Sequence, residues 1–174
     1  MSHYRILSFS TLAAAVLAAG FVAAPARADD ASCKPVLDAI TKATRTPYHE
    51  FATTGGKSFE KIYTTTALYV GSNGHWVKMP ASPQDLIDAL RESGAMFTEC
   101  KSLRTEMVAG QAATVYAARE RLTSVGEDDH SQFWIGNASG LPLKSESDSQ
   151  HGGQPSHVSP RFTYDNVQPP AGVQ

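Results

Sequence analysis

The sequence predicts an α+β domain in which about seven to nine antiparallel strands form a sheet that packs against two helices. The first observation is that most of the chain after Pro47 consists of short β-prone runs separated by turn residues. The second is that every connection between consecutive runs is short, which favours antiparallel neighbours over parallel crossovers. The third is that two segments carry one apolar stripe at helical spacing, and such a helix needs a surface to lie on.

Residues 1–28 have the features of a cleaved secretory signal peptide. A short stretch that ends at Arg5 precedes the apolar run 6–24, and Ala26-Arg27-Ala28 places small residues at both positions that a signal peptidase recognises. A retained membrane anchor is the alternative, but the weak, Ala-rich hydrophobicity of the run favours cleavage. We therefore expect a single mature domain over residues 29–174, exported to the periplasm.

The mature chain is mildly acidic. The signal contains two Arg and no acid, so its removal changes the formal net charge from −2 to −4. This balance, without a basic stripe, argues against a nucleic-acid partner. The acidic run Glu127-Asp128-Asp129 is interpreted as a solvated turn.

Both cysteines, Cys33 and Cys100, lie in the mature part of the chain. An oxidising compartment allows two such thiols to pair, so we expect a disulfide that fastens the first helix to the sheet. The alternative is a reactive thiol at Cys100, but the adjacent acid Glu99 disfavours a reactive thiolate.

The first helix is predicted from Ser32 to Thr44. Ser32 is its expected cap, and Pro47 marks the exit of the chain into extended structure. The apolar residues on one face of this helix are Cys33, Val36, Leu37, Ile40 and Ala43.

The second helix is predicted from the segment SPQDLIDALRESG, in which Ser82 is the cap and Pro83 takes the first helical position. Asp85, three residues after the cap, completes a capping box, and Gly94 ends the helix. Its apolar face contains Leu86, Ile87 and Leu90.

Turn residues divide the rest of the chain into strands. The Gly55-Gly56 pair accepts positive φ at both positions and predicts a hairpin. The segment SQHGGQPSHVSP, from Ser149 to Pro160, contains two Gly and two Pro, and is interpreted as a flexible loop between the last two strands. The runs expected to form strands are 48–54, 57–68, 69–70, 75–79, 96–104, 106–108, 113–122, 131–135, 141–149 and 159–167.

No residue pattern in the chain is typical of an enzyme, a cofactor site or a metal site, so we expect none of the three. Ser139 lies between glycines, but the spacing is not that of a nucleophile elbow and no helix follows. A hydrolase that uses His130 with Asp128 or Asp129 remains as one hypothesis. The histidines lie on separate segments, which argues against a zinc site: His49, His75, His130, His151 and His157.

Large aromatic side chains are concentrated in the predicted strands, and this has two interpretations. One is an ordinary core beneath the helices. The other is a partly open apolar cleft, because two short helices cannot cover so many strands. For the second interpretation, the expected rim consists of Trp76, Leu86, Leu90 and Trp134.

Three segments carry a resemblance to a known family. They are a Gly-x-x-Gly turn before HWVKM, the hairpin FWIGNASGLPLKSES at residues 133–147, and the closing FTYDNV. In their order along an exported chain, they resemble the outer-membrane lipoprotein-sorting (LolA-like) family. The resemblance implies a strongly curved antiparallel sheet, an incomplete β-barrel, which is covered by two helices and encloses a space for acyl chains or other apolar groups.

We therefore expect a soluble periplasmic binding protein that shelters a lipid or another hydrophobic moiety, as a carrier or a sensor. A lipoprotein or another envelope protein is a further expected partner, whereas integral membrane insertion is not expected. The alternative is a periplasmic protein–protein interaction module without a small-molecule ligand, of the inhibitor, immunity or envelope-stress-sensor type.

Overall fold

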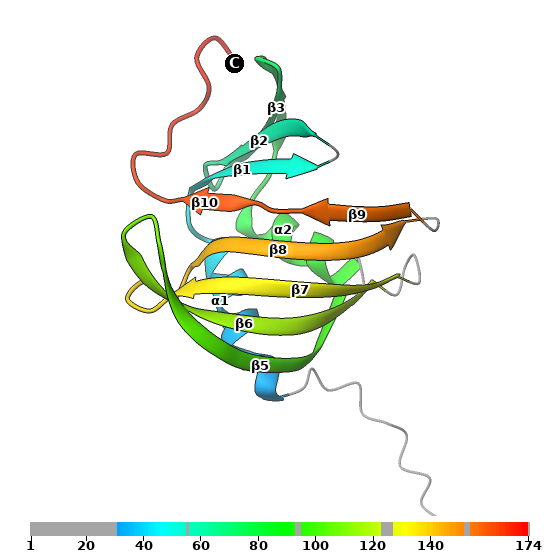
Figure 1. The fold of residues 1–174 in the computed structure, drawn as a ribbon. Helices are drawn as coiled ribbons and strands as arrows, with labels where there is room; N and C mark the ends of the chain where they lie inside the picture. The colour runs from blue at the N-terminus through cyan, green and yellow to red at the C-terminus, as the bar shows by residue number, and fades with distance from the viewer. Residues whose placement is uncertain (1–30, 55, 93–94, 123–126, 152–153, 174) are drawn as a thin grey trace, which may run out of the picture.

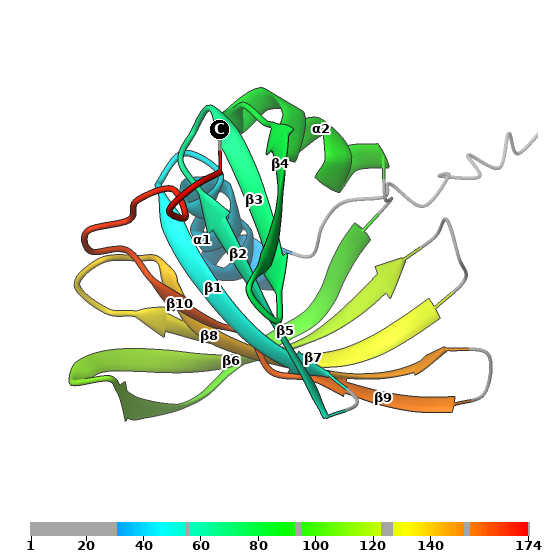
Figure 2. The same cartoon turned by 90° about the horizontal axis from the view of Figure 1, so that it is seen from above.

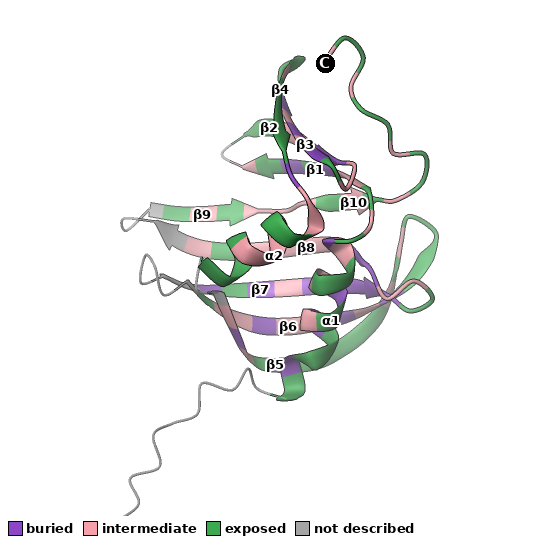
Figure 3. Cartoon of the chain, turned by 180° about the vertical axis from the view of Figure 1, so that it is seen from behind, coloured by how far each residue is buried: buried purple, intermediate pink, exposed green. Residues whose placement is uncertain are grey.

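The computed structural model describes residues 31–54, 56–92, 95–122, 127–151 and 154–173 (Figure 1). The predicted signal peptide lies outside the described residues. The described chain forms one large antiparallel sheet with two helices on the same face, which confirms the predicted α+β class (Figure 3). In the described part of the chain, neither helix is long and apolar enough to span a bilayer.

The elements follow one another with short connections. A single 3-10 turn, η1 (Ala31–Cys33), leads into α1 (Lys34–Ala43), and the helix α2 (Pro83–Glu92) is inserted between the fourth and fifth strands. The strands are β1 (Tyr48–Thr54), β2 (Lys57–Tyr63), β3 (Ala67–Ser72), β4 (His75–Pro80), β5 (Ala95–Val108), β6 (Gln111–Leu122), β7 (Glu127–Gly136), β8 (Pro142–His151), β9 (Gln154–Val158) and β10 (Arg161–Thr163).

The strand order explains why the sheet is open. It runs β4-β3-β2-β1-β10-β8-β7-β6-β5, and β9 continues the line of β10 by pairing with both β1 and β8. The first and last strands of this order, β4 and β5, do not pair, so the sheet is not a closed barrel. Figure 2 shows the sheet bending around α1. Register shifts in β5 between Thr98 and Lys101, with Glu99 at positive φ, add to this bend.

Helix α1 occupies the concave side of the sheet. Val36 and Ala39 are buried against Phe97, Phe133 and other side chains of the inner face, and Leu37 and Ile40 are partly buried there. The Cys33–Cys100 disulfide, with its Cα atoms 4.9 Å apart, fastens the start of this helix to β5, which confirms the predicted bridge.

Both ends of α1 are held by tertiary contacts. Ser32 was the predicted cap, but the capping position is Cys33 and no side chain caps the helix there, because the buried, disulfide-bonded Cys33 fixes the helix start. At the other end, the hydroxyl of the fully buried Tyr63 donates to the Thr44 carbonyl at 2.9 Å.

Helix α2 begins with the predicted capping box. The Asp85 amide donates to the Ser82 hydroxyl at 3.2 Å, and the Ser82 amide donates to the Asp85 carboxylate at 2.7 Å. These hydrogen bonds hold the pKa of the Asp85 carboxyl below its usual value. Gly94, the predicted terminator, lies outside the described residues. No residue of α2 is buried, although its apolar face is turned toward the sheet.

The sequence prediction missed one strand and misplaced the boundary between two others. The segment from Ser149 to Pro160 was predicted as a loop, but β8 continues to His151 and β9 pairs with it from Gln154 to Val158. Its polar composition hides the strand, because backbone pairing with β8 requires no apolar alternation. The run Lys57–Leu68 divides into β2 and β3 at a turn in which Thr65, rather than a glycine, takes positive φ. In the described part of the chain, the sheet has ten strands rather than seven to nine.

The remaining differences concern local turns and one strand. Glu127, Asp128 and Asp129, predicted as a solvated turn, belong to β7 and pair with β6. The predicted strands 96–104 and 106–108 form one continuous strand, β5. The β1–β2 hairpin is confirmed, and Gly56 has positive φ, whereas Gly55 lies outside the described residues.

Candidate functional site: an apolar hollow between the helices and the sheet

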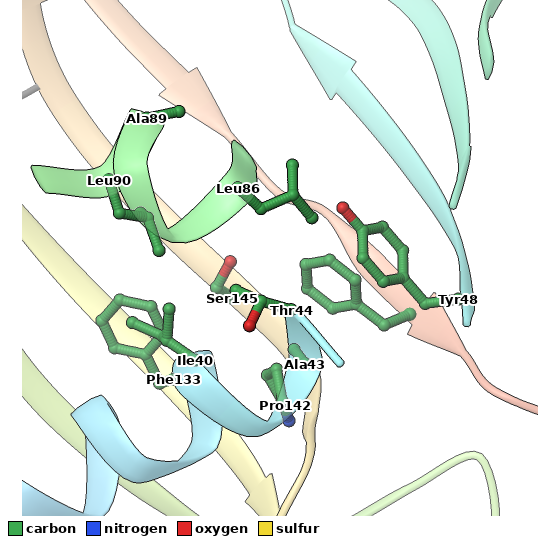
Figure 4. A pocket seen from close by; sticks show the side chains of 11 residues that line it. Ile40, Ala43, Thr44, Tyr48, Leu86, Ala89, Leu90, Phe133, Pro142 and Ser145 are labelled. Carbon is green, nitrogen blue, oxygen red and sulfur yellow. The ribbon is translucent and has the colours of Figure 1, made fainter. Parts of the chain in front are cut away.

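A hollow of about 380 Å³ lies between α1, α2 and the inner face of the sheet (Figure 4). Cavities of about 300–1,000 Å³ are typical of small-molecule sites. The residues around it come from α1, β1, α2, β7, β8 and β10, which lie far apart in the chain, so the hollow is a product of the tertiary fold. The residues that line it are Ile40, Ala43, Thr44, Tyr48, Leu86, Ala89, Leu90, Phe133, Pro142, Ser145 and Phe162.

The two helices and the sheet supply the apolar walls. The last turns of α1 contribute Ile40 and Ala43, which follow Val36 and Ala39 along the inner side of the helix. Helix α2 contributes Leu86 and Leu90, four residues apart and therefore on one face. The sheet contributes Phe133, whose ring packs edge-on against the buried Phe97 at 5.7 Å between ring centroids. Phe133, with Phe97 packed against it, therefore forms part of the floor of the hollow on the sheet side.

Polar groups around the hollow are few. The Thr44 hydroxyl is engaged with the Thr41 carbonyl at 2.8 Å. The Tyr48 and Ser145 hydroxyls are different, because neither has a hydrogen-bond acceptor within the described part of the chain. Burial, with Glu50 and Tyr63 as smaller causes, raises the pKa of Tyr48, so its hydroxyl keeps its proton at any physiological pH.

No ionisable side chain other than Tyr48 is among the described residues that line the hollow. The nearest buried acid on β1 is Glu50, which lies on the same face of the strand as Tyr48, and the Lys61 ammonium donates to its carboxylate at 3.1 Å. Lys42 lies on another side of α1, where its ammonium donates to the Ser139 carbonyl. The site is therefore uncharged and has two free hydroxyl donors.

Two of the four predicted rim residues line the hollow, and two lie elsewhere. Leu86 and Leu90 line it. Trp134 is 3% exposed on the opposite face of β7, where its indole N–H donates to Glu106 at 2.7 Å and the Lys144 ammonium lies 4.2 Å from its ring. Side chains of neighbouring residues in a strand point to opposite faces. Phe133 therefore faces the hollow, and Trp134 faces away from it.

Trp76 also lies outside the hollow. Its ring covers Gly71 on the neighbouring strand, where an added Cβ would come within 2.6 Å of the ring, and it packs with Ile62 and Tyr69. Trp76 and Trp134 therefore do not line this hollow, since ring size alone does not say which face of a strand is turned inward. Whether Leu86 and Leu90 bind a ligand stays a prediction.

Sequence reasoning missed the sheet-side and α1-side lining residues. Ile40 and Ala43 were assigned to the apolar face of α1 but not to a site. Phe133 and Tyr48 could have been found only by knowing which face of each strand is concave. Ser145 gives no apolar signal in the sequence, and the structure places it opposite Phe133 in the β7–β8 pair.

The hypothesis of a hydrolase is not supported by the arrangement of β7. Asp129 is buried and His130 is exposed, because neighbours along a strand point to opposite faces. The side chain of Asp128 lies outside the described residues. No group of three or more His, Cys, Asp or Glu side chains that could hold a metal occurs among the residues described.

Comparisons with known proteins give distant structural likenesses only. No protein-family model matches the sequence, and no curated protein matches it. The Mycobacterium tuberculosis lipoprotein LppX is 12% identical over 81% of this chain and 100% of its own, with a TM-score of 0.47. LprF from Mycobacterium bovis is 14% identical over 81% and 97% of the two chains, with a TM-score of 0.48. The hypothetical lipoprotein YmcC from Escherichia coli is 14% identical over 69% and 88%, with a TM-score of 0.37.

These likenesses do not assign the chain to a family, so the resemblance to the outer-membrane lipoprotein-sorting family stays a prediction. The class defined by the fold itself is an open, strongly curved antiparallel sheet with two helices on its concave side.

Proposed function

We propose that the protein is a periplasmic binding protein that shelters a lipid or another hydrophobic moiety in the hollow, as a carrier or a sensor. It would perform no covalent chemistry. Burial of apolar surface at roughly 25 cal/mol per Å² would drive binding, with about 0.8 kcal/mol for each methylene group that leaves water. The proposal includes export through the predicted signal peptide.

The observation that carries this proposal is the incomplete burial of α2. The helix has one apolar stripe, and Leu86 and Leu90 of that stripe line the hollow. Leu90 stays 39% exposed. A single apolar stripe normally packs against a complementary surface, and a bound apolar group in the hollow would complete the burial of this one.

The test is the binding of N-phenyl-naphthylamine, an uncharged apolar dye whose fluorescence rises in apolar surroundings. The matched pair of variants is Leu90→Asp and Leu103→Asp. The two leucines are almost equally exposed, at 39% and 41%, but only Leu90 lines the hollow. A carboxylate at position 90 would have to be desolvated by the dye, so we expect at least a tenfold weaker Kd for Leu90→Asp and an unchanged Kd for Leu103→Asp.

Thermal unfolding of both variants is the control for folding. The proposal fails if the folded wild-type protein does not bind the dye, or if the two Asp variants bind it equally well. Native mass spectrometry of the purified mature protein adds an independent measurement, since a carrier with a filled hollow retains a small apolar ligand.

One observation favours the alternative function, a protein–protein interaction module. The edge strand β4 carries Val77 and Met79 at 63% and 41% exposure, and its outer backbone groups do not pair with another strand among the described residues. Such an edge can accept a strand from a partner. A Val77→Lys substitution that abolishes capture of a defined envelope protein, in a chain that binds no apolar dye, would favour this alternative.

A further inference from the structure

The hollow offers two hydrogen-bond donors that meet no acceptor among the described residues. The Tyr48 hydroxyl points toward Leu86, and the Ser145 hydroxyl also points toward the α2 side of the hollow (Figure 4). No acceptor for either group is found in the described part of the chain. A wholly hydrocarbon ligand would displace the water that hydrogen-bonds to both hydroxyls and would offer no acceptor in its place. This loss opposes binding.

The framework around both hydroxyls is fixed. The Tyr48 ring packs against Tyr63 and Phe162 at centroid distances of 5.4 and 5.9 Å, so the phenol is held in place by its neighbours. Ser145 is held by its backbone, because its amide donates to the Pro160 carbonyl at 3.0 Å and its strand pairs with β7. Two donors held in place in an apolar space are typical of a site that orients a ligand by a small polar group.

The charge around the hollow excludes an anionic polar group. No Lys, Arg or His is among the described residues that line it. Lys61 is engaged with Glu50, and that carboxylate lies two residues from Tyr48 on the same strand face. A carboxylate or phosphate in the hollow would therefore lose its hydration without gaining a cation, because Lys61 on the neighbouring strand β2 is already paired with Glu50.

We propose that the hollow binds an uncharged acyl ester, such as a monoacylglycerol, rather than a free fatty acid or a pure hydrocarbon. The ester oxygens accept hydrogen bonds from the Tyr48 and Ser145 hydroxyls, and the acyl chain lies against Leu86, Leu90 and Phe133. This inference rests on the proposed function, and it specifies the ligand class of the same site.

The test compares glycerol monodecanoate with decanoate as competitors of bound N-phenyl-naphthylamine, which has no oxygen. The two competitors have the same acyl chain and differ in the polar group, which is an uncharged glycerol ester in one and a carboxylate in the other. We expect the wild-type protein to bind the ester at least tenfold more tightly than the ionised acid. We expect Tyr48→Phe and Ser145→Ala each to weaken ester binding by about threefold to tenfold, which corresponds to one lost hydrogen bond, whereas the dye, which loses no hydrogen bond, should bind each variant at least as tightly as the wild type.

The control is Tyr116→Phe, which removes the hydroxyl of another half-buried tyrosine that does not line the hollow. It should change neither affinity. If the dye binds but decanoate displaces it as well as the ester does, or if Tyr48→Phe and Ser145→Ala bind the ester like the wild type, the ester inference is wrong and the apolar hollow stands. If the dye does not bind to folded protein at all, the proposed function and this inference fail together.

Discussion

The disulfide between Cys33 and Cys100 has a measurable role in the stability of the wall formed by α1. The bond joins positions separated by 67 residues, and both cysteines are buried in the cluster that α1 forms with the sheet. We consider the double variant Cys33→Ala and Cys100→Ala, together with chemical reduction of the wild-type protein. Reduction removes only the cross-link, whereas the alanines also remove two buried sulfur atoms.

The expected loss follows from the size of the closed loop. On the chain-entropy relation, a loop of this length stabilises the folded state by about 4 kcal/mol relative to the open chain. Unfolding entropy near the midpoint is about 2.1 cal/mol/K per residue, so for a domain of this size the loss corresponds to a fall in Tm of about 10–15 °C. The double alanine variant should fall slightly further, because each missing sulfur leaves a small cavity.

The assay is thermal unfolding followed by circular dichroism, with and without reductant, at equal protein concentration. Reduction should change the Tm of the wild type and leave that of the double variant unaffected. A fall of less than about 3 °C on reduction would refute the reasoning, because the bond would then not restrict the unfolded chain as its loop length requires.

Three further predictions concern single residues. Tyr63→Phe leaves the buried Thr44 carbonyl without its donor, so urea denaturation should show a loss of about 1–3 kcal/mol, and an unchanged midpoint would contradict that hydrogen bond. Gly71→Ala places a methyl group against the Trp76 ring and should expose that ring, with a red-shifted emission and a loss of about 1–3 kcal/mol. Burial, and to a smaller extent the charge of Asp129, raises the pKa of the Glu120 carboxyl. Because this pKa is higher in the folded than in the unfolded chain, stability falls as the pH increases from the ordinary pKa toward the raised one. Glu120→Gln should therefore raise Tm at neutral pH and change it little at acid pH, where both folded and unfolded chains hold the proton; a lower Tm at neutral pH would contradict this.

Local signals in the sequence were sufficient for several elements. The Ser82 capping box depends only on residues within one helical turn, and the disulfide prediction depends on the redox compartment and the presence of two cysteines. The structure contains both features. The hairpin that begins at Phe133 is also confirmed, because its Gly and Asn turn residues are flanked by β-prone runs.

The site was less predictable, because its residues meet only through the curvature of the sheet. The choice between Phe133 and Trp134 depends on which face of β7 is concave, and no local signal carries that information. Ser145 shows the same difficulty in another form: a polar residue in a strand looks solvent-facing, yet this one lies at the floor of an apolar space. β9 was missed because a strand that pairs through its backbone alone leaves little apolar pattern.

The central claim is that an apolar group occupies the space between α1, α2 and the sheet, and methyl NMR tests it most directly. Protein labelled at Ile, Leu and Val methyl groups would be titrated with glycerol monodecanoate. We predict saturable shifts and ligand contacts at Ile40, Leu86 and Leu90, with Val77 and Leu103 unaffected. Shifts confined to Val77 on the edge strand, or none at the methyl groups around the hollow, would contradict the account.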